Sequence, residues 1–143
     1  MATSTALTTD LEQQLEEFVT VYDQEFARAA ATVGLSAAQA CVLGWTETQM
    51  PMSALARVLA CDASNVSQIV GRLEAHKLVE RTADTGDRRV KIVRMTPAGR
   101  RVYRRVRAQF DFAREGLGRL DAGEREQLGR LLAKMSGADE PAP

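Results

Sequence analysis

Three polar side chains lie on one line of a helix that the sequence predicts from Ala63 to about His76. Asn65, Gln68 and Arg72 are spaced i, i+3 and i+7, which places them on the same helix face. Two amides and a guanidinium have the donors and acceptors that pair with adenine and guanine edges in the major groove of DNA. Such a row has the chemistry to read base pairs if the surrounding elements bring it to DNA.

The helix that carries this line has recognisable ends and a separate buried face. Asp62 is a good N-cap, because its carboxylate accepts hydrogen bonds from the first backbone N–H groups. Apolar residues recur at helical spacing and form an inward stripe: Val66, Ile69, Val70 and Leu73. Ser64 and Ser67 flank the polar line, where small side chains let the backbone approach phosphates closely. A merely solvated polar face is the other interpretation, and the neighbouring elements decide between the two.

The residues upstream predict a helix-turn-helix. Pro51 and Met52 open a short helix whose Leu55, Val58 and Leu59 are expected to face inward. The segment Leu59-Ala-Cys-Asp62 then makes the three- to four-residue turn that is typical of this motif.

The residues downstream predict a β-hairpin with an arginine-bearing tip. Residues 78–81 and 90–95 have strand character, and the segment 82–89 between them contains turn-forming aspartates and a glycine. Arg88 and Arg89 at the tip suit a narrow minor groove, where negative potential is deepest. Asp87 is predicted to hold one of these two arginines in place.

The charges are segregated along a chain that is neutral as a whole. With 19 basic and 19 acidic residues, the composition by itself argues against a nucleic-acid partner. Residues 1–50, however, carry one arginine against seven acids, whereas residues 72–107 carry twelve lysines and arginines against four acids. A basic block that coincides with the predicted reading helix and hairpin is the electrostatic pattern of phosphate binding. The arginines of 100–107 are either further phosphate contacts or a solvated helix face.

Three motifs follow one another in the middle of the chain: LARVLACDASNVSQIVGRLEAHKLVER from Leu55 to Arg81, Asp84-x-x-Asp87-Arg88-Arg89, and Met95-Thr-Pro-Ala-Gly99. In combination they resemble the MarR family of bacterial transcription regulators. The resemblance implies a homodimer that binds a pseudo-palindromic operator in double-stranded DNA, usually as a repressor, with release by a small ligand or by oxidation. It assigns Ser64, Asn65, Ser67, Gln68 and Arg72 to the recognition helix, and Asp87, Arg88 and Arg89 to the wing.

The flanking segments predict long helices around this unit. The predicted fold is a single mainly α MarR-like domain, 1–143, with a small β-wing: a winged helix-turn-helix lobe, 36–95, and a helical dimerisation region, 5–33 and 97–136. The first helix is expected from Leu7 to about Ala31, with Gly34 ending it and Ser36 capping the next. Thr96 and Pro97 start a helix that Gly116 and Gly118 break, and Asp121 opens the last one. Residues 137–143 have the composition of a frayed tail.

Apolar faces on these terminal helices need a surface that buries them, and the same helices of a second subunit provide one. A two-fold dimer also places two recognition helices about 34–36 Å apart, one turn of DNA. Packing within one chain is the alternative.

An enzymatic function is not expected. The chain has one histidine, His76, and lacks a nucleophile with a base, a Walker-type loop and a dinucleotide-binding glycine motif. Cys41 and Cys61 have no companion ligands at metal spacing, so we expect neither a metal site nor a cofactor. No segment is apolar enough for a membrane span or a signal-peptide core, so a cytoplasmic protein without a membrane partner is expected.

The resemblance also places an effector site in the cleft between the dimerisation helices and the DNA-reading lobe. Tyr22, Phe26, Cys41 and Trp45 are the candidate lining residues, with walls that suit a small aromatic effector. Core packing accounts for the same residues, and buried structural thiols are expected for Cys41 and Cys61. Two functions stay open: a repressor released by a ligand, and an architectural or constitutive DNA-binding or interaction protein without ligand control.

Overall fold

The computed structural model describes residues 2–137, with side chains from residue 9 onward; of the predicted tail, 138–143 lie outside the described residues. The elements are α1 (Ala2–Ala31), α2 (Ala37–Trp45), β1 (Met50–Pro51), α3 (Met52–Val58), α4 (Ala63–Ala75), β2 (Val79–Ala83), β3 (Lys91–Met95), α5 (Pro97–Gln109), α6 (Phe112–Gly118) and α7 (Ala122–Met135). They form two compact units that divide between Phe110 and Asp111.

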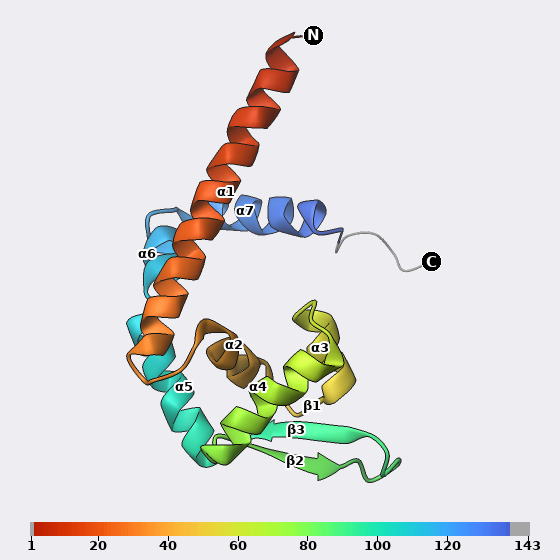
Figure 1. Ribbon diagram of the computed structural model, residues 1–143. Helices are drawn as coiled ribbons and strands as arrows, with labels where there is room; N and C mark the ends of the chain where they lie inside the picture. Colours follow the sequence, from red (N-terminus) through yellow and green to blue (C-terminus); the bar gives the residue numbers. More distant parts are fainter. Residues whose placement is uncertain (1, 138–143) are drawn as a thin grey trace. The chain divides into compact units, whose positions relative to one another are not determined.

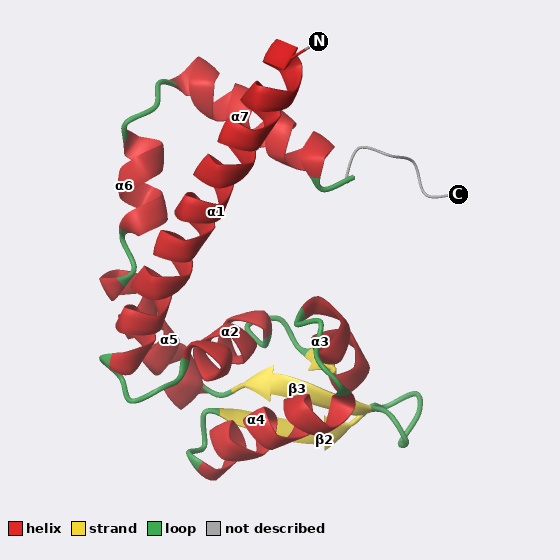
Figure 2. Cartoon of the chain, turned by 45° about the horizontal axis from the view of Figure 1, so that its top comes forward, coloured by secondary structure: helices red, strands yellow, loops and turns green. Residues whose placement is uncertain are grey.

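The first unit contains a winged helix-turn-helix, as predicted. Helices α2, α3 and α4 group beside a small antiparallel sheet of order β1-β3-β2, and the β2–β3 hairpin projects beyond them (Figures 1 and 2). Within the hairpin, Val79 is opposite Met95 and Ala83 is opposite Lys91. The predicted fold class, mainly α with a small β-wing, is confirmed.

The helix starts follow from local sequence signals. The side chains of Ser36, Asp62, Thr96 and Asp121 each accept a hydrogen bond from the backbone N–H three residues on. Each of these contacts satisfies a donor that the first turn of a helix leaves unpaired. All four predicted N-caps are therefore confirmed.

The core of the first unit lies where α2, α4, the sheet and α5 meet. Its fully buried side chains include Leu43, Leu55, Val66, Val70, Leu73, Val93 and Val106. The prediction that Val58 faces inward is wrong, because its side chain is 43% exposed at the last turn of α3. Leu55, one turn earlier, is the residue of α3 that reaches the core.

Two short features differ from the sequence prediction. Met50 and Pro51 form β1, a strand that the sequence did not predict, paired with Val93 and Ile92 of β3 before α3 begins at Met52. The long helix after Pro97 ends at Gln109 rather than at the glycines, because Phe110 leaves the helical conformation at φ −100° and ψ 85°. Gly116 and Gly118 instead lie within α6.

Helix α1 is longer than predicted and begins at Ala2 rather than at Leu7. The helix ends at Ala31, and the turn that follows contains Gly34. The φ of Gly34 is +75°, a conformation that glycine adopts without a steric penalty. Large apolar side chains on its outer half are exposed in the single chain: Leu11, Leu15, Phe18, Val19 and Val21. None of the helices in 2–137 is both long and apolar enough to cross a membrane.

Candidate nucleic-acid interface and adjoining cavity

The outer face of α4 displays the polar residues that the sequence singled out. Ser64, Asn65, Ser67, Gln68 and Arg72 are all exposed, whereas Val66, Val70 and Leu73 on the other side are fully buried. The carboxylate of Asp62 accepts from the Asn65 backbone N–H at 2.7 Å and fixes the start of the helix. Helix α4 therefore presents two amides and a guanidinium to solvent in one row.

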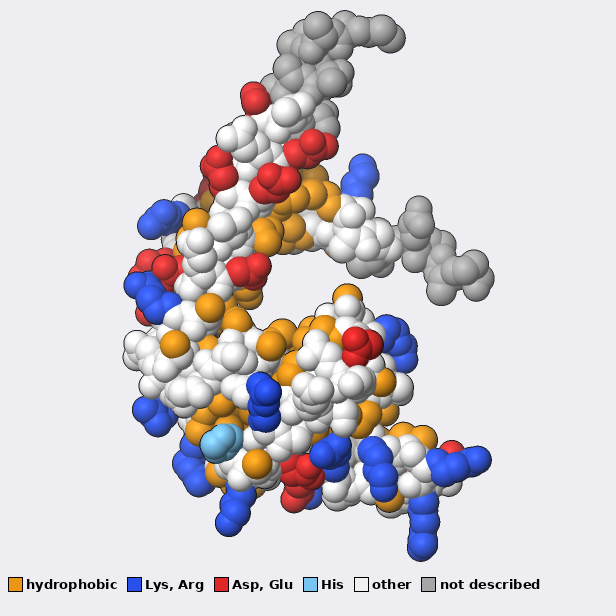
Figure 3. Space-filling model, in the orientation of Figure 1, with side chains coloured by type: hydrophobic (Ala, Val, Ile, Leu, Met, Phe, Trp, Pro, Cys, Tyr) orange, Lys and Arg blue, Asp and Glu red, His pale blue; other side chains and the backbone are white. Residues whose placement is uncertain are grey.

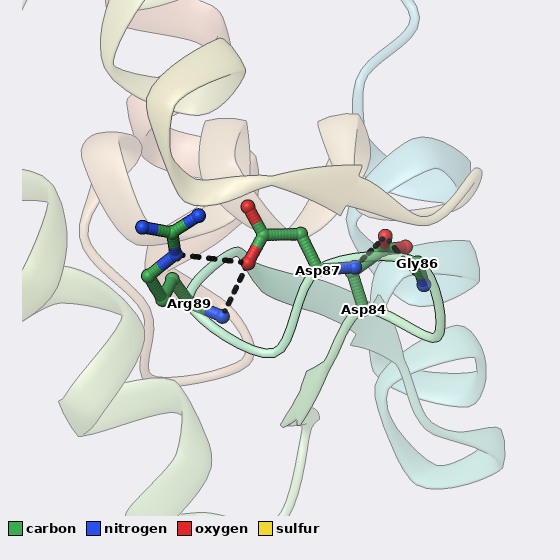
Figure 4. Close-up of polar contacts among 4 residues, drawn as sticks. All are labelled: Asp84, Gly86, Asp87 and Arg89. Atoms are coloured by element: carbon green, nitrogen blue, oxygen red, sulfur yellow. Dashed lines mark hydrogen bonds and ion pairs between the residues drawn. The ribbon is translucent and has the colours of Figure 1, made fainter.

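The wing loop is organised by its two aspartates (Figure 4). Asp84 Oδ2 accepts from the backbone N–H groups of Gly86 (3.1 Å) and Asp87 (3.2 Å), which closes the turn. Asp87 Oδ1 accepts from the Arg89 backbone N–H at 3.0 Å and from Arg89 Nε at 3.2 Å. The Arg89 side chain remains 92% exposed, so Asp87 anchors its Nε and leaves the outer nitrogens of the guanidinium open.

Ion pairs with acids occupy some of the lysines and arginines in the basic block 72–107. Within 72–107, four arginines pair with acids: Arg81 with Glu74, Arg89 with Asp87, Arg94 with Glu80 and Arg100 with Glu47. In the described part of the chain, no carboxylate forms an ion pair with Arg72, Arg88 or Lys91, and all three are exposed. Acidic side chains lie along α1, while lysines and arginines project around the hairpin (Figure 3). The charge separation expected from the sequence thus appears on the surface.

A contact that the sequence did not reveal joins α4 to the wing. Glu74 accepts from Arg81 Nε at 3.0 Å and from its terminal nitrogen at 2.8 Å, and also from the Arg81 backbone N–H at 3.3 Å. Both side chains are about one-third exposed. The hydrogen bonds from Arg81 lower the pKa of the Glu74 carboxyl. The contact spans the turn between a helix and a strand, so no helical or strand periodicity predicts it.

We expect Glu74→Gln to lower the free energy of unfolding by about 1 kcal/mol at pH 7, because the pair is partly solvent-screened. The folded pKa of Glu74 lies below its ordinary value of 4.5, so the carboxylate stabilises the fold above pH 4.5. The stabilisation disappears as the pH falls through the lowered pKa. Urea unfolding at pH 7 and at pH 3–4 measures the difference between wild type and variant. A difference that is the same at both pH values contradicts this role.

A cavity of about 580 Å³ adjoins α4 inside the first unit. The predicted effector residues Tyr22, Phe26, Cys41 and Trp45 all line it, together with Asp23, Asn65, Ile69, Tyr103 and Arg107 from α1, α4 and α5. Residues of the helix-turn-helix turn, Leu59 and Cys61, also contribute. The cavity is thus bounded by α1, α2, α4 and α5 and reaches the turn of the helix-turn-helix.

Aromatic packing sets the shape of the cavity. The Phe110 ring meets Tyr22 and Phe26 edge-on, with centroid separations of 4.9 and 5.4 Å. A Cβ at Gly44 would lie 2.6 Å from the Tyr103 hydroxyl oxygen, so only glycine lets α2 come this close to that ring. No spacing in the sequence indicates Asp23, Asn65, Tyr103 or Arg107 as cavity residues, because they come from three separate helices.

The cysteines differ from the burial expected of them. Cys41 and Cys61 are only half-buried, and both contact the cavity. Burial raises the pKa of the Cys41 thiol, which keeps it protonated near neutral pH and lowers its reactivity. Burial likewise raises the pKa of Tyr103. Within residues 9–137, no three His, Cys, Asp or Glu side chains lie close enough together to hold a metal ion.

Comparisons with known proteins agree with this geometry. Residues 33–90 match the model of the MarR family. The HTH-type transcriptional repressor NicR of Pseudomonas putida is 38% identical over 92 residues, which cover 62% of this chain and 56% of NicR. The chain therefore aligns with about half the length of this curated relative.

Two solved structures are similar over most of the chain. Bordetella bronchiseptica BpsR, whose DNA binding is regulated by 6-hydroxynicotinic acid, is 26% identical; 91% of this chain and 94% of that chain are covered, with a TM-score of 0.69. Streptomyces coelicolor Sco3205, a MarR family regulator solved in complex with DNA, is 22% identical; 96% of this chain and 90% of that chain are covered, with a TM-score of 0.78. The second likeness concerns the fold alone.

Proposed function

The chain belongs to the MarR family, and on this premise we propose that it is a sequence-specific DNA-binding transcription regulator that acts as a repressor. The observation that carries the proposal is the exposed row of Asn65, Gln68 and Arg72 on α4. The Glu74–Arg81 contact fixes this helix against the hairpin that carries Arg88 and Arg89. In this arrangement α4 enters the major groove, Ser64 and Ser67 approach phosphates, and the wing arginines enter the adjacent minor groove.

We propose further that two copies of the chain form a homodimer through residues 5–33 and 97–136. Exposed apolar side chains on α1, such as Leu15 and Phe18, and on α7, such as Leu131 and Leu132, support this, since water contact with so many is costly. Two-fold symmetry matches a pseudo-palindromic operator. Sedimentation at micromolar concentration should give a dimer, and a monomer there contradicts this part of the proposal.

The adjoining cavity supports control by a small aromatic effector. Its aromatic walls suit a planar ligand, and Arg107, which also lines it, forms no ion pair within residues 9–137. BpsR, which shares the fold and 26% of the aligned residues, responds to 6-hydroxynicotinic acid. We propose that a ligand of this chemistry enters the cavity and releases the protein from its operator. The homologues are transcription regulators, and we propose for this chain a regulatory role in the cytoplasm rather than an enzymatic one.

Selection of binding sites from a pool of random DNA duplexes tests the DNA-reading proposal. We expect enrichment of a pseudo-palindrome whose half-site centres are about one helical turn, or 10 base pairs, apart. Binding without enrichment of any sequence contradicts it and favours the alternative, an architectural or constitutive DNA-binding protein without ligand control.

A further inference from the structure

We propose that the Asn65 side chain belongs both to the cavity and to the face of α4 that contacts DNA. A ligand in the cavity and a base pair in the DNA then compete for the same amide. This inference rests on the proposed function and specifies how ligand binding reaches the DNA-reading surface. It requires no change in the spacing of two subunits, because the competition occurs within one winged unit.

The position of Asn65 on α4 is the first argument. An α-helix turns by about 100° per residue, so Arg72 lies about 20° from Asn65 on one side and Ile69 about 40° away on the other. Arg72 is exposed on the reading face, whereas Ile69 is half-buried and lines the cavity. Asn65 is both exposed and in contact with the cavity, so it lies on the border between the two surfaces.

The chemistry of the amide is the second argument. One Asn side chain offers a carbonyl acceptor and an NH₂ donor, and bidentate pairing with adenine uses both at once. A polar ligand group hydrogen-bonded to Asn65 from the cavity therefore removes this pairing. A good bidentate contact changes affinity by about five- to 150-fold, which is enough for a regulatory effect.

The backbone at this position is held independently of the side chain. The Asn65 backbone N–H donates to Asp62, and this contact persists when the side chain is shortened. Asn65→Ala therefore tests the amide without removing the helix cap. Gln68→Ala is the matched control, because Gln68 is an exposed amide one turn further along the same helix and does not line the cavity.

The experiment measures how much a ligand weakens DNA binding in each protein. 6-Hydroxynicotinic acid is the probe, and Trp45 fluorescence reports when the cavity is filled, because Trp45 lines it and is the single tryptophan of the chain. The dissociation constant for a selected duplex is measured without probe and at the probe concentration that saturates the fluorescence change. Circular dichroism confirms that both variants fold.

We expect the probe to weaken DNA binding by wild type and by Gln68→Ala by the same factor, about tenfold or more. Both variants bind DNA more weakly without probe, but for Asn65→Ala the probe should change the dissociation constant less than about twofold. An unaltered probe effect in Asn65→Ala overturns the inference. Trp45 fluorescence that does not change with the probe overturns both this inference and the proposed control by an aromatic effector. DNA binding measured without probe tests the DNA-reading function separately.

Discussion

Gly99→Ala should destabilise the fold by about 3 kcal/mol, because the added methyl group meets backbone rather than a flexible side chain. A Cβ at this position would lie 2.0 Å from the Leu78 carbonyl oxygen. That oxygen already accepts from the Thr96 backbone N–H at 3.0 Å, and the Thr96 hydroxyl donates to the Lys77 carbonyl at 2.7 Å. The start of α5 is thus fastened to the segment after α4, and the methyl group forces the two apart.

Gly129→Ala provides the matched control for this prediction. Gly129 lies inside α7, and a Cβ there meets nothing within 4 Å. Alanine should stabilise that helix by about 0.5–1 kcal/mol, the opposite sign from Gly99→Ala. Urea unfolding followed by circular dichroism measures both changes. Equal unfolding midpoints for Gly99→Ala and wild type would show that α5 does not depend on this close approach.

Arg89→Ala should weaken specific DNA binding by about 1–3 kcal/mol, or about five- to 150-fold. The Arg89 guanidinium is exposed at the wing, and Asp87 holds its Nε in place. An arginine that is already oriented loses less conformational entropy when it enters a groove. The loss should be largest at low salt, because the guanidinium also neutralises phosphate charge. Equilibrium binding to a selected duplex gives the magnitude.

Asp87→Ala distinguishes positioning from simple electrostatics. Removing a carboxylate next to DNA should strengthen binding if charge alone matters. We expect weaker binding instead, because Arg89 loses the partner of its backbone N–H and of its Nε. For the Arg89→Ala variant, Arg28→Ala on α1 is the control: it also removes an exposed arginine and should leave DNA affinity unchanged. Tighter binding by Asp87→Ala would contradict the positioning role.

Features with local causes could be predicted from the sequence. Asp62 and Thr96 cap their helices through contacts only three residues long, so the residue types alone indicate them. Val66, Val70 and Leu73 of the predicted stripe on α4 are buried, as helical periodicity indicates. The fourth residue, Ile69, is only half-buried, because it lines the cavity. The row of Asn65, Gln68 and Arg72 follows from the same periodicity, although its role in reading DNA remains a proposal.

Features with long-range causes could not be predicted in this way. Phe110 ends α5 while its ring packs against Tyr22 and Phe26 of α1, more than 80 residues earlier in the sequence. Strand β1 exists because Met50 and Pro51 meet β3, and Pro51 taken alone indicates only a helix start. At such positions tertiary packing, rather than the secondary-structure propensity of the residue, determines the conformation. The cavity residues Asn65 and Arg107 come together only in the folded unit.

The central claim, sequence-specific DNA binding by α4 and the wing, is tested most directly by one binding measurement. Purified protein is titrated with DNA from the region upstream of its own gene, or with a selected site, and with an unrelated duplex at several salt concentrations. We predict a preference of about a thousandfold or more for the specific site, with both affinities falling as salt rises. Equal affinity for a selected site and the unrelated duplex, with the same steep salt dependence, would contradict the claim.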